Sequence, residues 1–184
     1  MEMNKCDQQN HNDKPQGILF HEGVLPFVQA VTRYVLFAET PREETPLSSG
    51  LEEVCEVLAQ LYTTGLTLPD LPLSPYISLE RYVREEDYEK VRERMAIWLG
   101  EQDMYLDTQM EEMKYSDLPI GVSSAEILAD LYQMAADVAW VFRNGTEASM
   151  LQAIAEAKYG FRHEWASPLL ATLRHLHDTL ASTL

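Results

Sequence analysis

The last third of the chain places apolar residues at helical spacing between capping and breaking residues, and this pattern most restricts the fold. Ser123 begins a helix-start signal, and apolar side chains recur every three or four residues from there to Phe142. Asn144 and Gly145 then suit a left-handed cap that ends a helix. The spacing predicts one long helix over residues 124–143.

Two further helices are predicted between this segment and the C-terminus. Thr146 is placed to cap the first of them, because its hydroxyl can accept a hydrogen bond from the first helical turn. Gly160 and Pro168 interrupt the periodicity that follows. We therefore expect helices over residues 147–159 and about 167–182.

The first half of the chain shows the same apolar periodicity in shorter segments. A helix is predicted from about Gly23 to Glu39, and Pro41 ends it because the residue before a proline is displaced from the α region. Ser49 to Glu52 match the spacing of a capping box, so a second helix is predicted from there to about Thr67.

The middle of the chain connects these helical segments. Three prolines within residues 69–78 predict an extended connection. A charged third helix is predicted over residues 85–99, with Gly100 at its C-terminal end. We expect a short helix at residues 101–110 and then a loop up to the helix that begins at residue 124. No segment shows the alternation that is typical of a strand.

Together these segments predict an all-α fold, a single helical bundle of about six helices over residues 17–184 after a disordered tail at residues 1–16. The chain has 184 residues, of which 46% are hydrophobic, enough to bury one sizeable core.

No apolar run reaches the roughly 18–20 residues that a membrane span needs. The polar N-terminus lacks the pattern of a secretory signal, so a cytoplasmic location is expected.

The net charge of −16 restricts the partners. A field of this sign repels phosphate backbones and anionic lipid headgroups, and no cluster of Lys and Arg opposes it locally. We therefore predict binding neither to nucleic acid nor to membranes. A cationic partner is compatible with the charge, although acidity also favours solubility by itself.

The predicted helix at 124–143 carries several carboxylates on one side. Glu126, Asp130 and Asp137 point in similar directions, opposite the apolar stripe. We interpret them as a solvated acidic face, with a ligand site shared with another helix as the alternative. Trp140 lies on the same polar side, where either another segment covers it or a partner contacts it.

Cysteine and histidine residues give no metal or nucleophile pattern. Cys55 lies on an apolar stripe and is predicted to be a buried free thiol. His175 and His177 are two residues apart and point to different helix faces, unlike the spacing of helical zinc ligands. His177 is predicted to face the core. The sequence predicts no cofactor, no metal and no catalytic residue, and the common nucleotide and acyl-transfer motifs are absent from it.

The chain resembles a bacterial domain-of-unknown-function family, number 5063, found in Bacteroides relatives and in actinobacteria. The residues that carry the resemblance are Leu128 to Tyr132, Arg143 with Gly145, Ala153 to Phe161, His163 to Trp165, Ala171 to Arg174, and, upstream, Leu61-Tyr62, Leu68-Pro69 and Tyr105 to Asp107. The resemblance implies an all-helical domain. It implies no activity, cofactor or catalytic residue.

Two functional hypotheses remain. The first is a soluble, non-enzymatic interaction module that binds a protein partner or forms a homo-oligomer, with Trp140 as a candidate contact. The alternative is a small-ligand-binding protein or enzyme with a pocket between helices. Side chains with apolar bodies and polar tips would line that pocket. These candidates are Tyr62, Tyr132, Tyr159, His163, Trp165 and His177.

Overall fold

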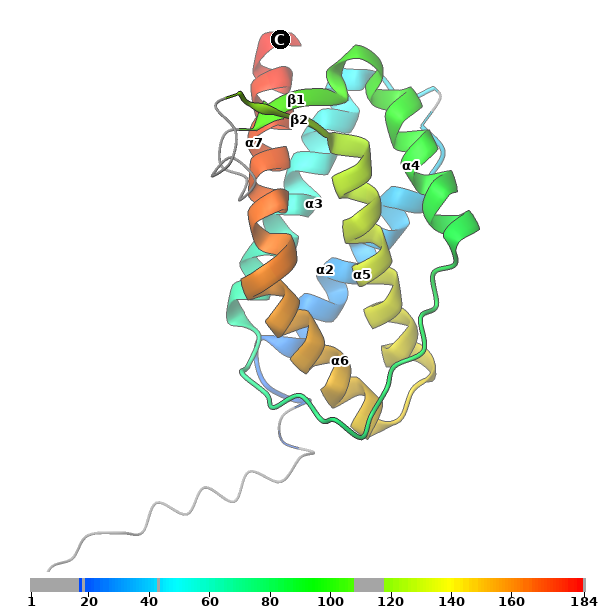
Figure 1. The fold of residues 1–184 in the computed structure, drawn as a ribbon, viewed down its shortest axis with the longest axis vertical. Helices are drawn as coiled ribbons and strands as arrows, with labels where there is room; N and C mark the ends of the chain where they lie inside the picture. The colour runs from blue at the N-terminus through cyan, green and yellow to red at the C-terminus, as the bar shows by residue number, and fades with distance from the viewer. Residues whose placement is uncertain (1–16, 18, 43, 108–117, 184) are drawn as a thin grey trace, which may run out of the picture.

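A computed structural model describes residues 17, 19–42, 44–107 and 118–183, and within them the protein is a helical bundle (Figure 1). Its helices are α2 (Val24–Glu39), α3 (Leu47–Thr67), α4 (Glu85–Leu99), α5 (Ser124–Asn144), α6 (Glu147–Gly160) and α7 (Ala166–Thr183). The predicted all-α fold is confirmed. The predicted tail at residues 1–16 lies outside the described residues.

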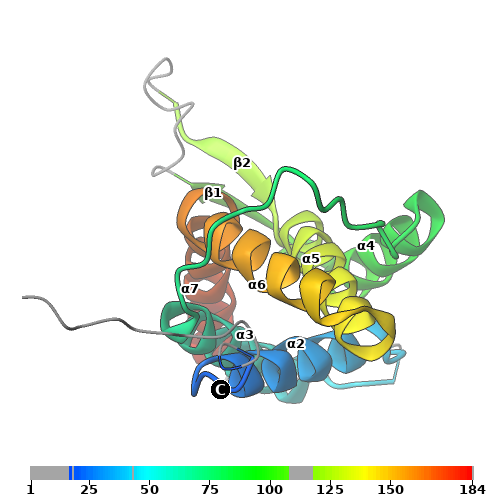
Figure 2. The same ribbon diagram turned by 90° about the horizontal axis from the view of Figure 1, so that it is seen from below.

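Helix α5 lies at the centre of the bundle. It packs against α2 and α4, while α3 packs against α7 and α2 (Figures 1 and 2). Their apolar stripes form one core, in which Phe27, Leu58 and Leu128 are fully buried. The buried hydroxyl of Tyr34 donates to the carbonyl of Leu128 across 2.8 Å, so α2 and α5 are also joined by a hydrogen bond within the core.

The proline-containing connection between α3 and α4 is extended, as predicted. It runs around the end of the bundle, across α6, before α4 begins (Figures 1 and 2). Three prolines prevent a helix here, because each lacks a backbone N–H and fixes its own φ. This connection therefore becomes one wall of the cleft described below.

One predicted helix start and one predicted cap are wrong, although α5 ends at Asn144, close to its predicted end. Helix α3 begins at Leu47 after Pro46, which starts a helix well because the first turn needs no N–H there. Ser49 donates to the Pro46 carbonyl at 3.0 Å instead of capping. Gly145 is extended, with φ −84° and ψ 177°, so the left-handed cap does not form. A Cβ atom there would lie 2.5 Å from the Val141 carbonyl oxygen, and close approach explains this glycine.

The predicted short helix at 101–110 is also wrong over residues 104–107, and residues 108–110 lie outside the described part of the chain. Residues Met104–Asp107 form strand β1, which pairs antiparallel with β2 (Ile120–Ser123). Contacts distant in sequence explain the difference: the Asp103 carboxylate accepts from the backbone N–H of Ala125 at 2.7 Å. The ring of Tyr105 stacks on His175 of α7 with centroids 4.7 Å apart. Strand β1 has consecutive apolar residues from Met104 to Leu106, so it does not show the alternation that indicates a strand.

Helices α6 and α7 are continuous through a π-helical turn, η3 (Phe161–Trp165), where the sequence predicted a break. Gly160 is buried and helical, and Pro168 is the third residue of α7, shortly after the π-helical turn, so neither residue ends the helix. The wider turn directs two aromatic rings to the core side together, with the centroids of Phe161 and Trp165 5.0 Å apart. Such turns recur at functional sites.

Candidate functional site

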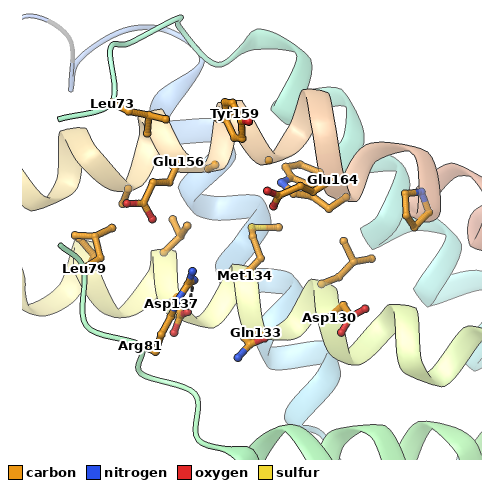
Figure 3. Close-up of a pocket in the computed structure, with 18 of the residues that line it drawn as sticks. Leu73, Leu79, Arg81, Asp130, Gln133, Met134, Asp137, Glu156, Tyr159 and Glu164 are labelled. Carbon is orange, nitrogen blue, oxygen red and sulfur yellow. Dashed lines mark hydrogen bonds and ion pairs between the residues drawn. The ribbon is translucent and has the colours of Figure 1, made fainter. Parts of the chain in front are cut away.

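A cleft of about 530 Å³ lies between α5 and α6 and extends to η3 and the start of α7 (Figure 3). The connection before α4 forms its remaining wall. Ten lining residues are apolar: Leu73, Leu79, Ile127, Leu131, Met134, Val138, Val141, Ala153, Ala157 and Pro168. Both the volume and the mixture of apolar walls with a few polar groups match small-molecule sites.

Asp137 fixes the connection against α5. Its carboxylate accepts from the backbone N–H groups of Tyr82 at 2.8 Å and Val83 at 3.2 Å. Arg81 pairs with the other oxygen at 3.0 Å, as the dashed contact in Figure 3 shows. Asp137 is 8% exposed, so the predicted solvated position is wrong for this residue. Its partners come from a non-helical segment that a helix wheel does not include.

The other two carboxylates of α5 are exposed, as predicted. Glu126 lies in the first turn, and Asp130 accepts from the hydroxyl of Tyr88 in α4 at 2.9 Å. Burial and this hydrogen bond raise the pKa of Tyr88, because both disfavour a negative phenolate. Tyr88 therefore stays a neutral donor to Asp130 over the physiological range.

The lining of the cleft is strongly acidic. It contains the carboxylates of Glu80, Asp130, Asp137, Glu156 and Glu164. Among the described residues that line it, Arg81 is the one cation, and its charge is matched by Asp137. Gln152 donates to Glu156 at 3.0 Å, but within the described part of the chain neither Glu80 nor Glu164 has a hydrogen-bond or ion-pair partner. The cleft thus carries several uncompensated negative charges.

One buried donor at the cleft has no acceptor. The side chain of Trp165 lines the cleft and is 8% exposed, yet its indole Nε1 has no hydrogen-bond partner among the described residues. Gly160 lets the indole come close, since a Cβ atom there would lie 3.1 Å from Nε1. Buried donors are normally paired, so this indole N–H is an exception that still lacks an acceptor in the described part of the chain.

The six predicted pocket residues do not all meet in one cavity. Tyr159 and Trp165 line the cleft, and His163 joins Tyr159 at a neighbouring smaller pocket of about 170 Å³. Tyr62 packs on Phe161, with centroids 5.4 Å apart. The remaining two candidates lie elsewhere.

Tyr132 donates to Glu39 at 3.0 Å, away from the cleft lining. His177 is exposed on α7, so its predicted core position is wrong. Helix α7 buries Leu169, Thr172, Leu176 and Thr179 instead, and this stripe leaves His177 outside it. The sequence reasoning missed Glu156 and Glu164. No local pattern marked them, because the cleft that they line is formed by segments distant in the sequence.

Trp140 is partly covered. Its ring stacks on Tyr82 of the connection, with centroids 4.6 Å apart and planes at 12°, and 41% of the residue remains exposed. This stack is a second contact between the connection and α5, next to the hydrogen bonds of Asp137. Trp140 as a contact surface remains a prediction.

The described residues form neither a metal site nor a membrane-spanning helix. Across residues 17, 19–42, 44–107 and 118–183, no group of three or more His, Cys, Asp or Glu side chains has a geometry suited to a metal ion. Within the same ranges, none of the helices combines the length and apolar character required to cross a bilayer.

Comparison with known proteins places the chain in a family. The model of a domain of unknown function, DUF5063, matches residues 20–182. The crystal structure of protein BF1032 from Bacteroides fragilis is similar, with a TM-score of 0.76 and 30% sequence identity, over 88% of this chain and 94% of that chain. No curated protein matches the sequence. The chain therefore belongs to the DUF5063 family.

Proposed function

We propose that this protein is a non-enzymatic interaction module whose cleft between α5 and α6 binds a positively charged segment of a protein partner. The observation that carries the proposal is the charge of the lining: among the residues that the structure describes, Glu80, Asp130, Glu156 and Glu164 have no cationic partner. The net charge of −16 adds long-range attraction for a cation.

The walls of the cleft suit a side chain with an apolar stem and a charged end. Leu73 and Met134 supply apolar surface next to the carboxylates (Figure 3). Lys and Arg bury their aliphatic stems while the charged group stays near its counter-ion. The same negative charges disfavour nucleic acid as a partner.

A free small-molecule cation is the second candidate, and the cleft volume of about 530 Å³ favours it. This volume lies in the range of about 300–1,000 Å³ that is typical of small-ligand sites. The two candidates differ in whether neighbouring peptide groups of a partner contribute to affinity.

Calorimetric titration with capped lysine-containing peptides tests the proposal. We expect binding that weakens as salt increases, because the attraction is partly screened. In a Glu156→Gln/Glu164→Gln variant the affinity should fall about tenfold, since two charges near the ligand are removed.

A matched control is Glu52→Gln/Glu101→Gln, which changes the net charge equally at exposed positions outside the cleft. It should keep most of the affinity. Equal loss in both variants would show that the overall charge, and not the cleft, attracts the peptide.

A further inference from the structure

The unpaired indole N–H of Trp165 restricts which ligand the cleft can hold. An indole nitrogen donates one hydrogen bond and accepts none, so its partner must be an acceptor. Trp165 is buried with Nε1 unpartnered among the described residues. Leaving this donor without an acceptor costs free energy, which a ligand that supplies an acceptor would recover.

The orientation of the indole places this donor at the cleft wall. Its benzene-ring end lies toward α3, because a Cβ atom at Gly65 would be 2.9 Å from Cη2. Its opposite edge lies at Gly160, where a Cβ atom would be 3.0 Å from Cδ1 and 3.1 Å from Nε1. Gly160 itself lines the cleft.

A carboxylate lies at the same place. One oxygen of Glu164, Oε2, would be 3.3 Å from that Cβ position of Gly160, so it and the indole N–H approach one point of the wall. Glu164 is exposed and points to the cleft in Figure 3. A donor and an acceptor are thus adjacent, and within the described residues neither has a partner.

We infer that Trp165 and Glu164 form a subsite for a peptide group of the bound segment, with Trp165 donating to its carbonyl oxygen and Glu164 accepting from a neighbouring N–H. This inference rests on the proposed function. It names the part of the partner that this subsite binds, a backbone peptide group. The basic side chain of the segment then lies toward Asp130 and Glu156.

The chemistry of the pair excludes simpler ligands. An alkylammonium ion has donors alone and cannot accept from Trp165. A carboxylate accepts, but Glu164 repels it. A neutral amide has both an acceptor and a donor, and therefore complements both groups.

Indole proton signals in ¹H–¹⁵N spectra test the subsite on the unmodified protein. The chain has three tryptophans, so three signals are expected, and Trp98→Phe and Trp140→Phe assign them. Trp98 is an internal control: its Nε1 is also buried and unpartnered, but it does not line the cleft. The probes are acetyl-Gly-Lys-Gly-amide and butylamine, which have the same charge.

We expect the peptide to shift the Trp165 signal and leave that of Trp98 unchanged, and butylamine to shift neither. Gly160→Ala should weaken the peptide about tenfold, because its Cβ crowds the subsite. Gly121→Ala is the control, since a Cβ there meets Met104 at an ordinary 3.5 Å.

Three results would overturn the inference, and they separate it from the proposed function. If the peptide binds and the Glu156→Gln/Glu164→Gln variant loses affinity, but the Trp165 signal does not move, the subsite is wrong and the proposed function stands. If butylamine shifts the Trp165 signal as much as the peptide does, the subsite does not recognise an amide. If neither probe binds, both proposals fail.

Discussion

At the scale of single residues, Asp137 is expected to be a costly carboxylate to replace. Asp137→Ala leaves the N–H groups of Tyr82 and Val83 and the charge of Arg81 without their acceptor. Unpaired buried donors cost about 1–3 kcal/mol, so we expect a loss of that size in the free energy of urea unfolding. Asp178→Ala, at an exposed position of α7, should change it little. Equal small effects would show that water replaces the carboxylate freely.

Residue roles were predicted best where the apolar stripe of the residue's own helix decides them, although His177 was wrongly placed on the stripe of α7. They were missed where another segment supplies the partner. Cys55 was predicted to be a buried thiol and is half-buried, and burial raises its pKa. Glu126 and Asp130 were correctly predicted to be exposed. Asp137 was missed, because no periodicity indicates that the chain at Tyr82 returns to α5.

At the scale of elements, the contact of α3 with η3 depends on a glycine. Gly65 is buried, and a Cβ atom there would lie 2.6 Å from Cδ2 of Phe161 and 2.9 Å from Cη2 of Trp165. Gly65→Ala must move rings that are themselves packed in the core, and overpacking of this kind costs about 1–3 kcal/mol.

Thermal and urea unfolding of Gly65→Ala measure this cost. Gly121→Ala serves again as the control, because its new Cβ meets a methionine methyl group at van der Waals distance. If Gly65→Ala proves as stable as the parent, or more stable through better helix propensity, the rings are not tightly held.

The elements differ in how far local sequence determines them. Helices α2, α4 and α6 begin and end close to their predicted bounds, because proline, Gly100 and Thr146 act through the backbone nearby. Gly100 has φ 55°, which favours glycine. The strands and the π-helical turn depend on contacts between distant segments, so no local pattern predicted them. The acidic cleft is lined by the connection before α4, by α5, and by α6 with η3 and the start of α7. Because these segments are distant in the sequence, no local pattern predicted the cleft either.

At the scale of the whole molecule, buried tyrosines couple stability to alkaline pH. Burial is the main cause that raises the pKa in four described tyrosines: Tyr34, Tyr88, Tyr105 and Tyr132. In the unfolded chain a tyrosine titrates near pH 10. Above that pH the unfolded state has lost protons that the folded state retains, so stability falls as pH rises. Lys158 opposes this trend, because burial lowers its pKa and makes stability rise with pH below about 10.5.

We therefore expect the urea midpoint to fall steadily between about pH 10 and 11.5, since four tyrosines outweigh one lysine. Fully buried Tyr34 alone contributes a slope of up to about 1.4 kcal/mol per pH unit there. Tyr34→Phe loses the hydrogen bond to Leu128 and is less stable at neutral pH, but its stability should depend less steeply on alkaline pH. Tyr76→Phe, at a 94% exposed position, should keep the parent slope. An unchanged slope in Tyr34→Phe would mean that the phenol ionises without unfolding, and that the core around α2 and α5 admits water.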